Sequence, residues 1–276
     1  MTNFYNYLLH HNVCNEYKED INAAKRVCTL ATKEIPRLIE LNKLLPGRFN
    51  HALSILTGGS ANDTYSRGGW DESSEARGIQ REEARIVALT GLMSYADDDT
   101  VEALSKNNWS ESLTCIESKV VEVEVSRIEK ATEEVKAVYS AQQETVKSKL
   151  TLERLGRLMC KPYQFPSFET YDQPGSGSNA AISLQTECAF LFEESLLELF
   201  VVGMKLEATV RTIEFGNGAR FSYLDDKWNL NPTYHTVLLN ELIKKPIPEL
   251  QWIKSKDELE KVKKAAEKDI AADSLD

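Results

Sequence analysis

The sequence predicts an α+β protein, in which a helical N-terminal half packs with an antiparallel β-sheet from the C-terminal half. Through much of the first 159 residues, apolar side chains recur every three or four positions, which is the period of an amphipathic helix. β-Branched and aromatic residues gather instead in 182–225, where Gly216-Asn217-Gly218 separates two strand-like runs and signals a β-hairpin. We therefore expect a single α+β domain over residues 1–254, followed by a charged helix or tail over 255–276.

The N-terminal half divides into helical segments at its glycines and prolines. Pro36 lies inside the longest periodic run and predicts either a kink or a second helix that starts there. Pro46-Gly47 ends that run, Gly58-Gly59 ends the next, and Asp97 provides a helix N-cap. The expected helices cover residues 8–11, 17–45, 49–56, 81–95 and 101–105.

The spacing of apolar residues changes from every three or four positions to every second position near residue 119. Val121, Val123 and Val125 alternate with glutamates, which predicts a half-buried strand over 119–126. Helical, mostly polar sequence resumes over 131–159. Strands are then expected over 182–192 and 208–225, and helices over 234–244 and near the C-terminus, where Leu259, Val262, Ala266 and Ile270 form a thin apolar stripe.

Composition excludes several classes of protein. The formal net charge of −10 disfavours a broad electrostatic grip on nucleic acid and favours a protein partner. The five cysteines include no CxxC pair, which is typical of reduced intracellular thiols. No apolar run has the roughly 18 residues of a membrane span, and the N-terminus lacks the basic region of a secretory signal. We expect no membrane association.

The densest group of metal-ligand residue types is His10, His11 and Cys14. Adjacent helical residues point about 100° apart, so the two imidazoles cannot both face one ion together with Cys14. Zinc needs three or four ligands, and the remaining cysteines and histidines are isolated in the sequence. We predict no metal and no other cofactor, and interpret this stretch as a packed N-terminal segment with one imidazole and Cys14 turned inward.

Patterns of catalysis are similarly weak. The glycine-rich stretch 58–80 reads as a surface loop, since it lacks the lysine and hydroxyl of a phosphate-binding loop and follows no strand. No GxSxG elbow is present. The adjacent Glu193 and Glu194 are the types of residue that perform acid–base chemistry, but we interpret them as solvated surface carboxylates. We expect no catalytic residue and no enzymatic activity.

The loop 58–80 holds the clearest candidate for partner binding. Gly69 and Trp70 place a large aromatic side chain between small and acidic residues. An exposed Trp on a glycine-rich tether buries a large area in a partner at low cost in side-chain entropy. The alternative is that Trp70 folds back and pins its own loop.

Four blocks of sequence, in order, resemble one protein family. They are FYNYLLHHNVCNEYKEDINAAKRVC with LNKLLPGRFNHAL, then TGG with a downstream Gly-Gly-Trp, then GMKLEATVR, then NPTYHTVLLNELI. These blocks extend from Phe4 to about Ile243 and resemble the Argonaute-binding subunit family of the fungal Argonaute siRNA chaperone (ARC) complex.

The resemblance implies a non-enzymatic subunit that acts in RNA interference, heterochromatin assembly and gene silencing. Its expected partners are Argonaute and the second Argonaute-binding subunit of the complex, with siRNA contacted indirectly through Argonaute. Such a complex regulates duplex siRNA loading and the slicing or release of the passenger strand. Argonautes carry tryptophan pockets that accept Gly-Trp peptides, which gives Gly69 and Trp70 a specific expected role. Residence in nucleus and cytoplasm is expected.

A direct RNA-binding module is the alternative. In this hypothesis Phe215, Phe221 and Tyr223 of the predicted sheet stack on bases, and Arg211 and Arg220 contact phosphates. In an acidic protein, these aromatic residues suit a protein core better. The sequence also leaves open which surface binds Argonaute, the oligomeric state, and whether the Gly-Ser-Gly-Ser run (Gly175–Ser178) is native or a spliced linker near 174–178.

Overall fold

The computed structural model describes residues 1–13, 15–61, 81–106, 108–145, 150–164 and 187–235. These residues all belong to one compact unit. Several predictions lie outside the described ranges: those for Cys14, Gly69, Trp70, Gly175–Ser178 and the tail 255–276.

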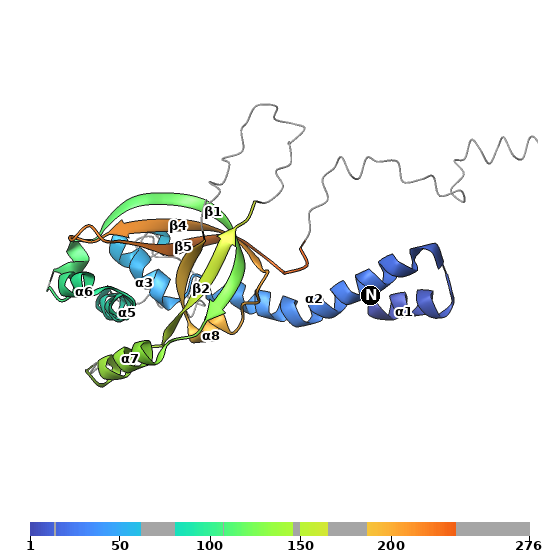
Figure 1. Ribbon diagram of the computed structural model, residues 1–276, viewed down its shortest axis with the longest axis horizontal. Helices are drawn as coiled ribbons and strands as arrows, with labels where there is room; N and C mark the ends of the chain where they lie inside the picture. The colour runs from blue at the N-terminus through green and yellow to red at the C-terminus, as the bar shows by residue number, and fades with distance from the viewer. Residues whose placement is uncertain (14, 62–80, 107, 146–149, 165–186, 236–276) are drawn as a thin grey trace, which may run out of the picture. The chain divides into compact units, whose positions relative to one another are not determined.

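Helices precede and interrupt a single sheet (Figure 1). The helices are α1 (Thr2–His10), α2 (Lys18–Leu44), α3 (Arg48–Thr57), α5 (Arg81–Met93), α6 (Asp98–Leu104), α7 (Glu133–Thr145) and α8 (Glu194–Leu197). The strands are β1 (Thr114–Glu129), β2 (Leu155–Pro162), β3 (Cys188–Glu193), β4 (Lys205–Glu214) and β5 (Arg220–Asn231). The prediction of an N-terminal helical half and a C-terminal antiparallel sheet is therefore confirmed.

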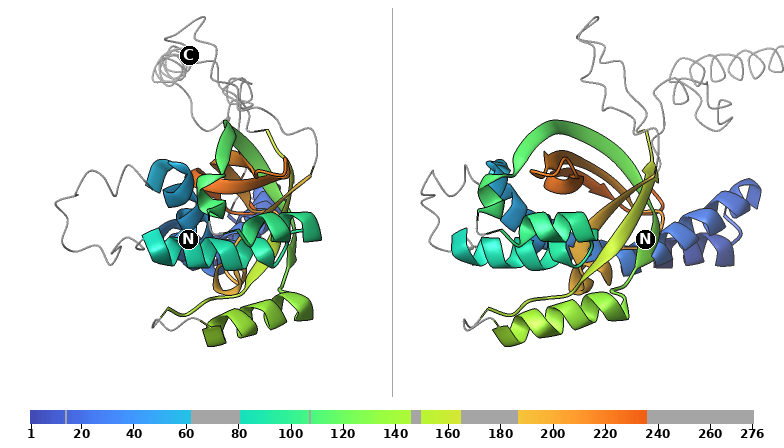
Figure 2. Two further views of the ribbon diagram at one scale, coloured as in Figure 1. Left: turned by 90° about the vertical axis from the view of Figure 1, so that its left-hand side faces the viewer. Right: turned by 60° about the vertical axis from the view of Figure 1, so that its left-hand side comes forward.

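The sheet has the strand order β3-β2-β1-β4-β5, and every neighbouring pair is antiparallel. It curls strongly, so that the described strands form a nearly closed barrel with α3 beside the gap (Figure 2). Asn50 of α3 bridges the two edge strands. Its amide nitrogen donates to the carbonyl of Leu191 in β3 at 2.9 Å, and its amide oxygen accepts from the backbone N–H of Leu224 in β5 at 3.3 Å.

Two hydrophobic clusters stabilise this arrangement. Because side chains alternate along a strand, β3 contributes to both clusters: Leu191 packs with α3, α5 and α7, whereas Phe190 and Phe192 pack with β1, β2, β4 and the C-terminal end of α2. Val121, Val123 and Val125 of β1 are buried in the second cluster, as their alternation predicts.

The predicted helix over 131–159 is wrong in its second half. Residues 133–145 form α7, but Leu155–Pro162 is the strand β2, which pairs with β1 on one side and β3 on the other. Leu158 and Cys160 are fully buried in that sheet. The segment LGRLMCKP has few β-branched residues, so tertiary pairing overrides its local propensity. β1 is also longer than predicted, at 16 residues.

The longest helix also differs from its prediction. α2 continues through Pro36 as one element of 27 residues, so the hypothesis of a second helix beginning at Pro36 is wrong. Only Ile21, Glu34 and Leu41 of α2 are buried. Glu34 is held by the end of β5, since its carboxylate accepts from the hydroxyl and the backbone N–H of Thr233 at 2.7 and 2.9 Å.

Two local predictions are confirmed. The side chain of Asp97 caps α6 by accepting from the backbone N–H of Thr100 at 2.9 Å. Phe215 and Ala219 close the turn between β4 and β5, where Asn217 also donates to the hydroxyl of Thr100. Within the described ranges, no helix combines the length and hydropathy that a bilayer crossing requires.

Candidate interaction surface

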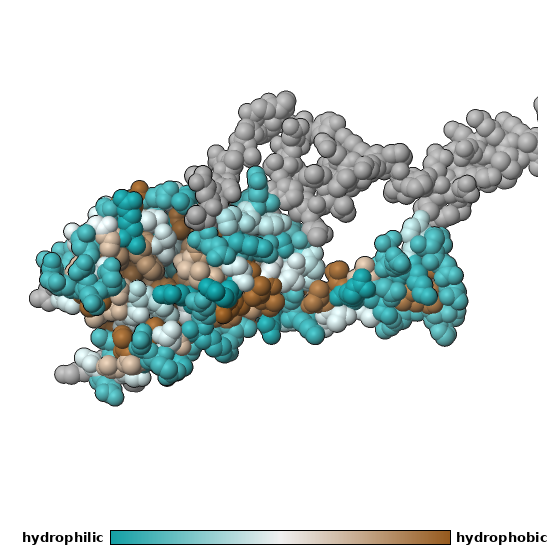
Figure 3. Space-filling model, in the orientation of Figure 1, coloured by the Kyte–Doolittle hydropathy of each residue, from teal (hydrophilic) through white to brown (hydrophobic). Residues whose placement is uncertain are grey.

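The most exposed apolar surface of the described chain lies on α1 and α2, which project from the sheet in Figure 1. We call residues 1–44, apart from residue 14, the helical arm. Of the twelve large hydrophobic side chains that are exposed in the described residues, ten belong to the arm, and hydrophobic surface is visible along it in Figure 3. They are Met1, Phe4, Tyr7, Val13, Tyr17, Val27, Leu30, Ile35, Ile39 and Leu44.

One face of α2 combines apolar and basic side chains. Arg26, Leu30, Lys33 and Arg37 follow the spacing i, i+4, i+7 and i+11, which places them on the same side of the helix. All four are exposed. The three cations take part in none of the ion pairs formed among the described residues. This basic stripe is unlike the chain as a whole, which carries a net charge of −10.

The end of α1 corrects the prediction for the two histidines. His10 and His11 are both exposed, so neither imidazole is turned inward, and no residue of α1 is buried. Their rings lie edge to face at 4.9 Å, and the ring of His11 lies 4.3 Å from that of Tyr7. The described residues contain no group of three or more His, Cys, Asp and Glu side chains suited to a metal ion.

The structure describes the residues on either side of the segment that contains Gly69 and Trp70. Before that segment, Ser60 and Ala61 are fixed to the sheet by the buried carboxylate of Asp225 in β5. One oxygen of Asp225 accepts from the hydroxyl of Ser54 at 2.5 Å, and both accept from the backbone N–H of Ser60 at 3.1–3.2 Å. The hydroxyl of Ser54 in turn accepts from the N–H of Ala61 at 3.0 Å.

Gly59 is required by this network, because a Cβ there would lie 2.2 Å from Asp225 Oδ1 and 2.4 Å from Ser54 Oγ. Nearby, the hydroxyls of Thr57 and Tyr223 lie 2.6 Å apart, and burial raises the pKa of Tyr223. Burial lowers the pKa of His51, and the neighbouring charge of Asp225 opposes that change. The network is thus a rigid attachment point for the chain that follows residue 61.

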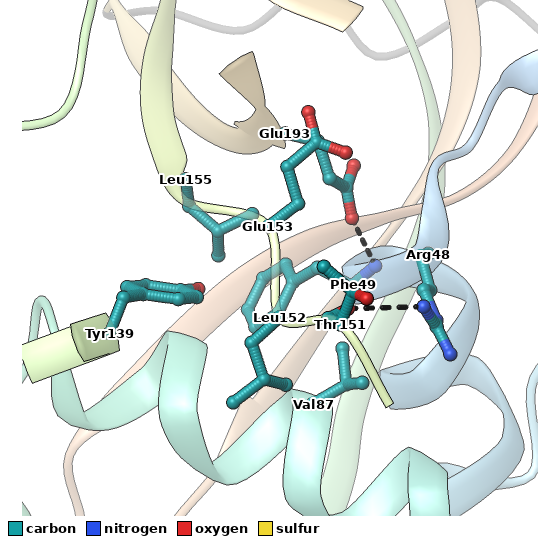
Figure 4. A pocket seen from close by; sticks show the side chains of 9 residues that line it. All are labelled: Arg48, Phe49, Val87, Tyr139, Thr151, Leu152, Glu153, Leu155 and Glu193. Carbon is teal, nitrogen blue, oxygen red and sulfur yellow. Dashed lines mark hydrogen bonds between the residues drawn. The ribbon is translucent and has the colours of Figure 1, made fainter. Parts of the chain in front are cut away.

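A small pocket lies beside the N-terminus of α3 (Figure 4). Its polar lining includes Glu193, Glu153, Tyr139 and Arg48, and the guanidinium of Arg48 donates to the carbonyl of Thr151 at 3.3 Å. Burial raises the pKa of the Tyr139 hydroxyl.

Glu193 is buried, which corrects the interpretation of Glu193 and Glu194 as solvated carboxylates. Its Oε1 accepts from the backbone N–H of Phe49 at 2.6 Å, in the first turn of α3. Gly47 occupies the N-cap of α3 and has no side chain to cap it, and a Cβ there would lie 2.5 Å from Glu193 Oε2. Glu193, at the end of strand β3, therefore caps helix α3. Burial raises the pKa of Glu193 despite that hydrogen bond.

Glu194 is also engaged, since its carboxylate accepts from the backbone N–H of Ala131 at 3.1 Å. Both glutamates therefore hold separate segments together. Each carboxylate accepts a hydrogen bond from a backbone N–H, which is a structural role.

The aromatic residues of the RNA-binding alternative do not form a stacking platform. Phe215 and Tyr223 are buried in the first hydrophobic cluster. Phe221 is half-buried and lies edge to face with Phe49 at 6.1 Å. Of the two cations, Arg211 donates to the sulfur of Cys115 at 3.2 Å, and Arg220 pairs with Glu214 at 3.1 Å. The rings of Phe215 and Tyr223 are therefore unavailable to bases.

Three features described above were not predicted from the sequence: the basic and apolar stripe of α2, the anchoring role of Asp225 and the capping role of Glu193. The stripe of Arg26, Leu30, Lys33 and Arg37 was readable from its helical spacing, but the helix was expected to bury its apolar positions. The roles of Asp225 and Glu193 depend on partners 171 and 144 residues away in sequence, and no local pattern marks such contacts.

Comparison with known proteins identifies a family for most of the chain. The model of the family described as Argonaute siRNA chaperone (ARC) complex subunit Arb1 matches residues 1–246. No curated protein and no solved structure matches the chain.

Proposed function

The chain belongs to the family of the Argonaute siRNA chaperone complex subunit Arb1, and from that premise we propose that it is a non-enzymatic subunit that binds Argonaute directly. Membership supports a role in the complex and in RNA-guided silencing. The proposal adds that the chain, together with a second Argonaute-binding subunit, regulates duplex siRNA loading and the slicing or release of the passenger strand. It also includes residence in nucleus and cytoplasm.

The observation that carries the proposal is the exposed apolar surface of the helical arm. Exposed apolar side chains that are concentrated in one region of a protein often mark a site of protein–protein interaction. Fully burying one Leu or Ile side chain contributes about 1.5–3 kcal/mol. Leu30 and Ile39 are 41% and 54% exposed, so both have much of that contribution still to gain in a complex.

Charge indicates which surface of Argonaute the arm fits. The apolar Leu30 lies among Arg26, Lys33 and Arg37, so its partner should present an apolar ridge flanked by Asp or Glu, as an amphipathic helix does. Alternation of apolar and basic positions favours this protein surface over a phosphate backbone, which needs cations without apolar anchors. We therefore propose an acidic helical surface of Argonaute as the site for the arm.

Gly69 and Trp70 form a second proposed contact, in a tryptophan pocket of Argonaute. They lie outside the described residues, so the support is their sequence and the attachment at residue 61. Asp225 and Ser54 hold that attachment to the sheet. Two contacts carried by one chain reinforce each other, so binding of the arm would raise the effective concentration of Trp70 near a tryptophan pocket.

The test is a pull-down of the full chain with purified Argonaute. The proposal predicts a complex at micromolar concentration, and its absence would refute the proposal. Trp70→Ala is expected to weaken the complex while leaving the melting temperature unchanged. Wild-type binding in that variant would reject the tryptophan contact alone, since the arm remains intact.

A further inference from the structure

Two cysteines face each other across the edge of the sheet. In the antiparallel pair of β2 and β3, Cys160 is directly opposite Cys188. Directly opposite residues point to the same face, and their Cβ atoms lie about 4.5–5.5 Å apart. The Cα separation in such pairs, about 4.5–5.5 Å, falls within the range of about 4.4–6.8 Å that a disulfide accepts. The register of β2 and β3 thus places the two cysteines at a Cα separation that a disulfide accepts.

Both thiols are free, and their environments differ. Cys160 is fully buried in the second hydrophobic cluster, whereas Cys188 is half-buried. The thiol of Cys160 lies near the carbonyl of Leu158, to which it donates at 3.9 Å. Interaction between the two thiols lowers the pKa of Cys188 and, together with burial, raises that of Cys160. Burial and the charge of Glu187 oppose this lowering of the Cys188 pKa, whereas the charge of Lys119 supports it. The more accessible sulfur is therefore the better nucleophile.

We propose that Cys160 and Cys188 are a modification site, at which a low-molecular-weight disulfide such as oxidised glutathione converts the dithiol into a cross-strand disulfide. The Cys188 thiolate attacks one sulfur of the reagent, breaks its S–S bond and releases one thiolate. The Cys160 sulfur, after losing its proton, attacks Cys188 in the mixed disulfide and displaces the second thiolate. The protein loses two electrons and two protons, and the reagent becomes two thiols.

The bond would have a structural consequence that is independent of Argonaute. It closes residues 160–188 into a covalent loop and ties the edge strand β3 to β2. β3 carries Leu191 and Glu193, which hold Asn50 and the N-terminus of α3. A cross-link of this kind restricts the unfolded chain and stabilises the fold, so oxidation should raise the melting temperature by several degrees and reduction should reverse the rise.

The test is a titration of the full chain with oxidised glutathione, read by intact mass and peptide mapping. The expected product has lost two hydrogens, yields one peptide pair linked through Cys160 and Cys188, and returns to the dithiol with a reductant. Cys28→Ser is the matched control, because Cys28 is a half-buried cysteine on α2, away from the pair, and this variant should give the same product.

Single substitutions separate the two steps. Cys160→Ser should stop the reaction at a stable glutathione adduct on Cys188, and Cys188→Ser should leave Cys160 unmodified. The proposal is overturned if the wild type retains both thiols at high oxidant, if the linked peptides contain other cysteines, or if Cys160→Ser and wild type give the same adduct. Unchanged circular dichroism of each variant shows that the fold is intact.

Discussion

The sheet buries its large hydrophobic side chains, whereas the helical arm leaves most of its own exposed. Phe190, Phe192 and Tyr223 of the strands are almost wholly buried, whereas Phe4 and Tyr7 of α1 are 58% and 57% exposed. The strands and α3 therefore form the stable body of the chain. The arm contributes to that body mainly through Leu41 at the C-terminal end of α2, and its ten exposed apolar side chains remain available to a partner. Both regions contain large hydrophobic residues, and the tertiary contacts decide which of these residues are buried.

The largest expected difference between the regions is in the free energy of unfolding. Phe192→Ala removes a fully buried ring from the second cluster and should cost about 3–5 kcal/mol. Tyr7→Ala, on the exposed face of α1, should change the free energy of unfolding by less than about 0.5 kcal/mol. Urea denaturation of both variants measures this. Similar losses in the two would show that the arm is part of the cooperative core.

A second, smaller effect is expected at the bridge between the edge strands. Asn50→Ala leaves the carbonyl of Leu191 and the N–H of Leu224 without their buried partner. Each unsatisfied group costs about 1–3 kcal/mol, and with the lower value for both groups the variant should lose about 2 kcal/mol. Asn6→Ala on exposed α1 is the control and should be nearly neutral. If Asn50→Ala lowers the free energy of unfolding no more than the control does, the sheet keeps its curvature without Asn50.

The smallest stability effect concerns the cap at α3 and depends on pH. Because burial raises the folded pKa of Glu193 above its unfolded value, this group favours folding most at low pH and loses that contribution as pH rises through the folded pKa. Glu193→Gln keeps an acceptor for the N–H of Phe49 and removes the charge. The variant should therefore gain stability relative to wild type as pH rises above the ordinary glutamate pKa of about 4.3.

Thermal melts of both proteins across that range measure the difference. A constant difference would mean that Glu193 does not titrate there. Glu102→Gln is the control, because Glu102 is exposed on α6.

The sequence predicts the features whose determinants are local. The turn at Gly216-Asn217-Gly218, the cap at Asp97 and the alternation of Val121, Val123 and Val125 all depend on neighbouring residues, and all are present. The strand β2 was not predictable in this way, because pairing with β1 and β3 decides its conformation.

The exposed surface of the helical arm could not be predicted from local sequence either. The apolar period of α2 is real, but period alone does not say whether the apolar face is covered. Only the tertiary structure shows that Ile35 and Ile39 are exposed while Leu41 is buried. The family resemblance over the four sequence blocks was visible from residues alone and is confirmed; the surface that the family role uses was not.

The most direct test of the central claim is a titration of purified Argonaute with two charge-inserting variants of the full chain. Leu30→Glu places a carboxylate within the basic and apolar stripe of the arm, whereas Val202→Glu places one at an exposed apolar position outside it. The account predicts at least a tenfold loss of affinity for Leu30→Glu, about 1.4 kcal/mol, with unchanged melting temperatures and wild-type affinity for Val202→Glu. Equal affinity of Leu30→Glu and wild type for Argonaute would contradict it.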